Sequence, residues 1–296
     1  MRVGSNLIQG FFTLVNFKKL VFKQFKNPPR NTGAVTPERF NRQLEPSSWE
    51  VDGFKLVSIN QTNPHNIHLV FLHGGAYLLE ANTFHRRFLE KLALEYQLGI
   101  TIIDYPKAPE YTWQTTINLV KKAYLEITDR NPGNHFCILG DSAGGGLALA
   151  LLQVLRDGGI TPFPQKTVLI SPWLDLSLSN DRVWEYERID HLLPVQGLIY
   201  AGKIYSGGED LRNPLLSPIY GDLSNLGEMI LFGGTNEVFY PDCLALVDKI
   251  SCSQGTSIQS VYGQDMFHDW VIFPLKESDQ AVKQIVQFIL AGTQDA

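Results

Sequence analysis

From residue 54 onward, short apolar runs alternate with longer segments in which apolar residues recur about every 3.6 positions. The short runs are typical of buried strands and lie at 54–59, 67–72, 100–104, 136–139, 167–171, 229–232 and 257–261. The periodic segments predict helices over 86–96, 114–128, 145–156, 242–250 and 279–290. This alternation predicts an α/β fold: a mostly parallel sheet flanked by helices, with active residues in loops beyond the carboxyl ends of the strands.

Two stretches break the alternation, and we expect both to lie above the sheet as lid segments of one domain over 1–296. The first, 1–46, begins with an apolar run and continues into a segment rich in Pro, Asn and Gln. The second, 176–216, holds a helical pattern at 195–205 between a strand and a turn.

The apolar run at 7–25 is open to three interpretations. Asn16, Lys18 and Lys19 interrupt it and no small-residue cleavage site follows, so neither a membrane-spanning helix nor a secretory signal fits. A lid helix docked on the protein, a helix that contacts a membrane surface and a targeting segment remain. The charge here is one-sided: six basic residues and no acid precede Asn31, whereas the rest of the chain carries 19 bases and 30 acids.

Composition narrows the class of protein. The chain has 296 residues, of which 44% are apolar and 19% charged, as in globular proteins, so general disorder is excluded. A net charge of −5 argues against a nucleic-acid partner. Three cysteines suit a reducing, cytoplasmic compartment, and no motif for a metal or a nucleotide cofactor occurs.

A candidate nucleophile lies between a predicted strand and a predicted helix. The sequence Gly-Asp-Ser-Ala-Gly at 140–144 follows the strand at 136–139, and small residues on both sides of Ser142 would permit the strained turn that exposes its hydroxyl. Backbone amides at a helix start favour an oxyanion. A loop that binds phosphate or merely turns is the structural alternative.

A second element follows the strand at 67–72 and reads His-Gly-Gly-Ala-Tyr at 73–77. Glycines allow the backbone to approach a reacting carbonyl, so we expect the amides of Gly74, Gly75 and Ala143 to form an oxyanion hole. We interpret His73 as a residue that holds this loop by hydrogen bonds.

A serine hydroxyl needs a base, and His268 follows the last predicted strand. The acid should follow the strand before it, where Glu237 and Asp242 compete, although either could instead cap the next helix. His65 and His68 lack a third ligand for zinc. We expect His85, His135 and His191 on the surface or in loops.

Taken together, these motifs resemble the hormone-sensitive-lipase-like branch of the α/β-hydrolase superfamily. The resemblance rests on 73–76, on Tyr-Pro-Lys-Ala-Pro-Glu at 105–110, on Gly-Asp-Ser-Ala-Gly-Gly at 140–145, on Ser-Pro-Trp-Leu-Asp at 171–175 and on the region of His268. It covers roughly residue 54 to the end. Its Gly-x-x-Asp pattern has a glutamate in this chain, which favours Glu237 as the acid, with Asp242 as the alternative.

The resemblance implies an α/β-hydrolase with a helical lid and a serine carboxylesterase acting on small-molecule esters of short to medium acyl chains. It implies no cofactor. Two alternatives are an amide or peptide hydrolase on the same fold and a non-catalytic small-molecule binding protein. The expected lid also supplies aromatic side chains for an apolar pocket, namely Phe11, Phe12, Trp184, Tyr186, Tyr200 and Tyr205.

Overall fold

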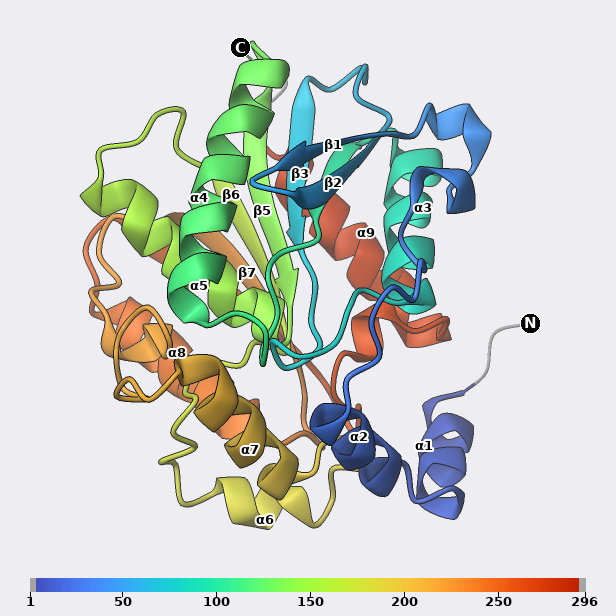
Figure 1. The fold of residues 1–296 in the computed structure, drawn as a ribbon, viewed down its shortest axis with the longest axis vertical. Helices are drawn as coiled ribbons and strands as arrows, with labels where there is room; N and C mark the ends of the chain where they lie inside the picture. The colour runs from blue at the N-terminus through green and yellow to red at the C-terminus, as the bar shows by residue number, and fades with distance from the viewer. Residues whose placement is uncertain (1–3, 293–296) are drawn as a thin grey trace.

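The computed structural model describes residues 4–292, which form an eight-stranded sheet in the order β1-β2-β4-β3-β5-β6-β7-β8 (Figure 1). The first two pairings in this order, β1 with β2 and β2 with β4, are antiparallel, and all the others are parallel. The strands are β1 (Ser47–Val51), β2 (Phe54–Ile59), β3 (Ile67–Leu72), β4 (Gly99–Ile103), β5 (His135–Asp141), β6 (Lys166–Ile170), β7 (Gly227–Gly234) and β8 (Thr256–Gly263).

All seven predicted strands are present, and β2 and β3 have the predicted bounds. Every residue of β3 is buried, which explains why all its residues except His68 are apolar. Strand β1 was missed because it lies at the sheet edge and only Val51 is buried. It joins β2 through Asp52 and Gly53, whose φ values of 49° and 80° are typical of a tight hairpin turn.

Helices cover both faces of the sheet, as predicted (Figure 1). Helices α3 (Thr83–Tyr96) and α9 (Lys276–Leu290) pack together on one face, and α4 (Trp113–Arg130) and α5 (Ala143–Asp157) on the other. Helix α8 (Tyr240–Ser251) packs against β7 and β8. Short 3₁₀ turns occur at η1 (Pro37–Arg39), η2 (Arg42–Leu44), η3 (Pro218–Tyr220) and η4 (Trp270–Ile272).

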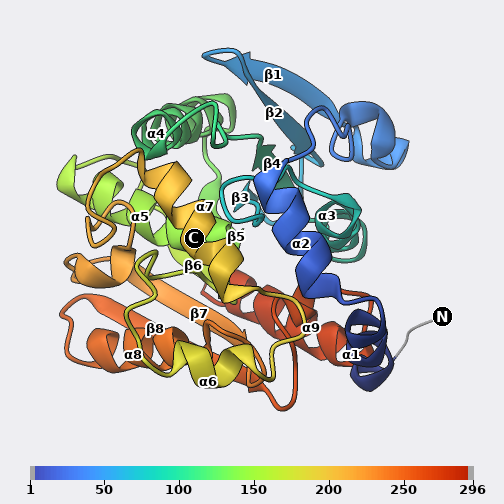
Figure 2. The same ribbon diagram turned by 60° about the horizontal axis from the view of Figure 1, so that its bottom comes forward.

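Four further helices gather at the carboxyl ends of the parallel strands (Figures 1 and 2). They are α1 (Ser5–Leu14), α2 (Phe17–Lys26), α6 (Val183–Glu187) and α7 (Val195–Ser206). All four lie within the predicted segments 1–46 and 176–216. Residues 1–3 of the first segment lie outside the described range. The apolar run at 7–25 forms two helices because Asn16 adopts a left-handed conformation with φ 48°. Helix α2 packs closely on α7, where a Cβ on Gly197 would lie 3.1 Å from the ring of Phe25.

Across residues 4–292, every helix is too short or too polar to cross a lipid bilayer.

Candidate active site

Ser142 occupies a sharp turn between β5 and α5. Its φ of 51° and ψ of −120° form a strained conformation that proteins retain mainly at functional positions. The flanking glycines are sterically required: a Cβ on Gly140 would lie 2.3 Å from the carbonyl oxygen of Gly144, and one on Gly144 would lie 1.9 Å from that of Leu72. The turn places the serine at the carboxyl edge of the sheet.

His268 lies between Ser142 and Glu237. Its Nε2 is 2.9 Å from Oγ of Ser142, and its Nδ1 is 2.9 Å from Oε2 of Glu237. The other carboxylate oxygen of Glu237 accepts a hydrogen bond of 2.9 Å from the amide of Gly234, which fixes the orientation of the carboxylate. The three side chains follow β5, β7 and β8, so the parallel sheet itself brings them to one place.

Asp242, the alternative acid, does not contact His268. It lies in the first turn of α8 and accepts a hydrogen bond of 3.0 Å from the side-chain amide of Asn180. Its other oxygen is buried and has no hydrogen-bond partner among the described residues. Burial raises the pKa of Asp242 to about 6. The geometry therefore favours Glu237 as the partner of His268.

A second carboxylate, not anticipated from the sequence, lies beside the imidazole. Oδ2 of Asp269 is 3.1 Å from Nε2 of His268, the same atom that faces Ser142. Burial lowers the pKa of His268, but the carboxylates of Asp269 and Glu237 outweigh it, so this pKa lies well above its usual value. Burial raises the pKa of the Asp269 carboxyl.

The amide set predicted for an oxyanion requires one correction. The N–H of Gly74 donates to Oδ1 of Asp141 at 3.0 Å and is therefore already occupied. Within residues 4–292, the amides of Gly75, Ala76 and Ala143 have no hydrogen-bond partner. Gly75 and Ala76 line the same cavity as Ser142 and His268. Among the described residues, the amide of Ala76 and not that of Gly74 is thus open to an oxyanion in this loop.

His85 was expected on the surface or in a loop, but it is buried at the start of α3. Its Nδ1 accepts a hydrogen bond of 2.9 Å from the amide of Asn82. The ring proton must then be on Nε2, which lies 3.0 Å from Oδ2 of Asp141 and donates to it. Asn82 and His85 form a capping box at the helix start, and this three-residue spacing before an apolar helix was the available sequence signal.

Asp141 connects this helix to the loop after β3, because its two oxygens accept hydrogen bonds from His85 and from the amide of Gly74. His73 holds the same loop, as expected: its Nδ1 donates to the carbonyl of Gly74 at 2.7 Å, and its ring stacks on Tyr105 with centroids 4.3 Å apart.

A cavity of about 760 Å³ opens above Ser142 and His268. Its wall is mainly apolar and combines residues of α1, α2 and α7 with Phe273 and other residues near the sheet. Of the expected lid aromatics, Phe11 and Phe12 line it, whereas Trp184, Tyr186, Tyr200 and Tyr205 do not. Tyr205 instead stacks on Tyr77 with ring centroids 3.9 Å apart.

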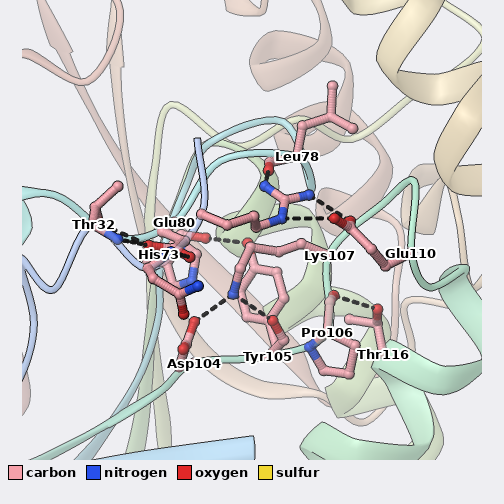
Figure 3. A network of polar contacts seen from close by, with 12 residues as sticks. Thr32, His73, Leu78, Glu80, Asp104, Tyr105, Pro106, Lys107, Glu110 and Thr116 are labelled. Carbon is pink, nitrogen blue, oxygen red and sulfur yellow. Dashed lines mark hydrogen bonds and ion pairs between the residues drawn. The ribbon is translucent and has the colours of Figure 1, made fainter. Parts of the chain in front are cut away.

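A polar network joins the amino-terminal segment to the loop after β3 (Figure 3). The guanidinium of Arg30 donates to the carbonyl of Leu78 at 2.6 Å and to that of Ala108 at 2.7 Å, and it pairs with Glu110 at 2.6 Å. Lys107, in the motif at 105–110, pairs with the carboxylate of Asp104. The amino-terminal segment is thereby fixed to the loop that carries Gly75 and Ala76.

Comparisons with known proteins agree with this fold. A family model described as an alpha/beta hydrolase fold matches residues 69–272. An acetyl-hydrolase of Streptomyces hygroscopicus is 32% identical over 228 residues, 76% of each chain, and an esterase of Acinetobacter venetianus is 30% identical over 230 residues, 74% of each chain. The solved structure of a hormone-sensitive lipase from a metagenome library superposes with a TM-score of 0.78 at 27% identity, covering 95% of this chain and 98% of that one.

Proposed function

The chain belongs to the α/β-hydrolase family, in its hormone-sensitive-lipase-like branch, and from this premise we propose that it is a serine esterase acting on short to medium acyl esters. Homology establishes the coarser activity, that of a carboxylic ester hydrolase. The observation that carries the finer proposal is that His268 joins Ser142 and Glu237 at 2.9 Å on each side.

In the proposed reaction, Nε2 of His268 takes the proton of Ser142 while Oγ attacks the ester carbonyl carbon. Glu237 holds Nδ1–H and stabilises the imidazolium that forms. The amides of Gly75, Ala76 and Ala143 receive the negative oxygen of the tetrahedral intermediate. The intermediate collapses, and the leaving alcohol takes the proton from Nε2. Water activated by the same imidazole then releases the acid from Ser142.

The cavity supports the substrate range in this proposal. A volume of about 760 Å³ is within the range of small-molecule pockets, and aromatic rings such as Phe12 and Phe25 offer an apolar wall for an acyl chain. We assign segments 1–46 and 176–216 the role of a lid, because their helices supply one side of that wall.

The test is the variant Ser142→Ala, with Ser251→Ala, an exposed serine of α8, as the matched control. We expect Ser142→Ala to lower kcat for p-nitrophenyl butyrate by about 10⁴-fold or more and to abolish covalent labelling by a fluorophosphonate probe. The control variant should keep both properties, and circular dichroism should show that both variants fold. Undiminished hydrolysis or labelling in Ser142→Ala would refute the proposed nucleophile.

A further inference from the structure

Helix α1 exposes an apolar stripe to solvent. Leu7, Phe11 and Leu14, spaced four and then three residues apart, are 71%, 57% and 84% exposed, and they lie on one side of the helix. The opposite side packs on the protein through the buried Phe12. Helix α1 contains no charged residue. Helix α1 therefore has apolar residues on its solvent-facing side as well as on its buried side, and no other described residue covers the exposed ones.

Helix α2 exposes a basic stripe with the same spacing. Lys19, Lys23 and Lys26 are exposed, and α2 contains no acidic residue. Leu20, 47% exposed, lies beside Lys19. Lys18 differs from the other three, because it donates to the carbonyl of Glu187. The adjacent helices therefore present an apolar stripe and a row of positive charges, although the chain as a whole has a net charge of −5.

The two helices that carry these stripes also line the active-site cavity. Phe11 and Phe12 of α1 and Val21 and Phe25 of α2 line the cavity that contains Ser142. Figure 2 shows α1, α2 and α6 on the side of the molecule that is turned forward. Seven of the eleven large hydrophobic residues that are exposed within residues 4–292 belong to the two lid segments, namely Leu7, Phe11, Leu14, Leu20, Trp184, Ile189 and Ile199.

We propose that this docking face, formed by Leu7, Phe11, Leu14, Lys19, Leu20, Lys23 and Lys26, binds the surface of an anionic lipid membrane. Apolar side chains that enter the headgroup region beside lysines that contact anionic headgroups are the features of an interfacial helix. Docking in this orientation places α1 and α2, which line the cavity, against the bilayer. The delivery of membrane-borne esters to Ser142 rests on the proposed function, but docking itself does not.

Charge favours a membrane over a second copy of the chain. In a two-fold symmetric dimer through this face, the lysine rows of the two copies would lie close together and repel each other. An anionic bilayer instead complements all three lysines at once, and each lysine near such a surface strengthens binding by about fivefold.

The experiment is co-sedimentation of the full chain with vesicles of phosphatidylcholine alone or mixed with phosphatidylglycerol. We expect binding to the mixed vesicles that weakens as salt is added, and weak binding to phosphatidylcholine alone. The combined variant Lys19→Gln, Lys23→Gln and Lys26→Gln should bind mixed vesicles about 100-fold more weakly. The variant Leu7→Ser with Leu14→Ser should also lose binding, including at low salt.

Matched controls change charge and apolarity to the same extent elsewhere. Lys55→Gln, Lys276→Gln and Lys283→Gln remove three exposed lysines outside the lid segments, and Leu94→Ser alters an exposed leucine of α3. These controls should bind as the wild type does. Ser142→Ala should also bind normally, which separates a failure of docking from a failure of the proposed chemistry.

Three results would overturn the proposal. The first is no binding of the wild type to mixed vesicles, and the second is an equal loss of binding in the matched controls. The third is a dimer in light scattering that the docking-face variants convert to a monomer, because the face would then be covered by a second copy.

Discussion

Asp269 and Ser142 both lie beside Nε2 of His268, at 3.1 Å and 2.9 Å. One ring nitrogen therefore faces both a hydroxyl that must lose its proton and a carboxylate that stabilises the protonated ring. Glu237 occupies Nδ1 on the other side. Other buried groups near the ring are Asp190 and Asp141, the second with its partner His85. Burial raises the pKa of Asp190, and the nearby His268 partly offsets this. The site is rich in carboxylates, which favour imidazolium.

The acid limb of the pH–activity profile should respond to Asp269. Only neutral His268 can accept the serine proton, and the carboxylates raise its pKa, so activity is lost as pH falls through this raised value. Asp269→Asn removes one negative charge, and we expect the acid limb of kcat/KM to move by about one pH unit or more toward lower pH. Asparagine also suits the left-handed φ of 58° at this position.

The control for this prediction is Asp265→Asn, an exposed acid three residues before His268, which should leave the profile unchanged. A profile of Asp269→Asn that superposes on that of the wild type would mean that Asp269 does not control the protonation of His268.

The two candidate acids should separate clearly in kinetics. Glu237→Gln keeps the shape of the side chain but loses the charge that stabilises imidazolium, so we expect kcat to fall by about 10³–10⁴-fold. Asp242→Asn should leave kcat near that of the wild type, because Asp242 contacts Asn180 and not His268. Hydrolysis of p-nitrophenyl butyrate by the two purified variants measures both effects. A larger loss in Asp242→Asn would reverse the assignment.

Buried strands could be predicted from the sequence, because burial requires apolar residues. Strand β3 is buried throughout, and its six residues, all apolar except His68, gave its bounds directly. The placement of Ser142, Glu237 and His268 followed from the same alternation, since each comes after a strand of a parallel sheet. Edge strand β1 was not recognised in this way, because it has only two apolar residues, Trp49 and Val51, and only Val51 is buried.

Hydrogen-bond partners were harder to predict, because they depend on side chains that are distant in sequence. The amide of Gly74 had the right residue type and position for an oxyanion donor, yet Asp141, 67 residues away, occupies it. His85 was assigned to the surface for the same reason: its partner Asp141 is 56 residues away. Pattern and spacing locate the backbone, whereas the polar contacts require the packed structure.

Substitutions of His85 and Asp141 should have strongly non-additive effects on the free energy of unfolding. His85→Leu leaves Oδ2 of Asp141 buried without a donor, and Asp141→Asn places an amide donor opposite Nε2–H or opposite the amide of Gly74. We expect each single variant to lower the free energy of unfolding by about 2–3 kcal/mol. The double variant should lose clearly less than the sum, because both changes break the same contact. Urea unfolding of the four proteins measures this, and strict additivity would contradict it.

Asp242 should destabilise the folded protein at neutral pH, because its pKa is raised in the folded state. Burial raises this pKa from 3.8 to about 6, so between those values the folded state binds more protons than the unfolded state. Stability is therefore lost as pH rises through this window, and above pH 6 the folded protein carries a buried charge with one unpaired oxygen. Asp242→Asn removes that charge while its side-chain oxygen can still accept from Asn180. We expect a gain of about 2 kcal/mol in the free energy of unfolding at pH 8.

The same variant should differ little from the wild type near pH 4, where the carboxyl is protonated in the folded protein. Urea unfolding at the two pH values, with kcat as a check on the site, measures this difference. Asp248→Asn, an exposed acid on the same helix, is the control and should change stability little at either pH. Equal stability of Asp242→Asn and the wild type at pH 8 would mean that its surroundings already stabilise the buried charge of Asp242, which would contradict the prediction. A gain at pH 8 without loss of kcat would show that Asp242 is a buried structural acid, which leaves Glu237 as the carboxylate that serves His268.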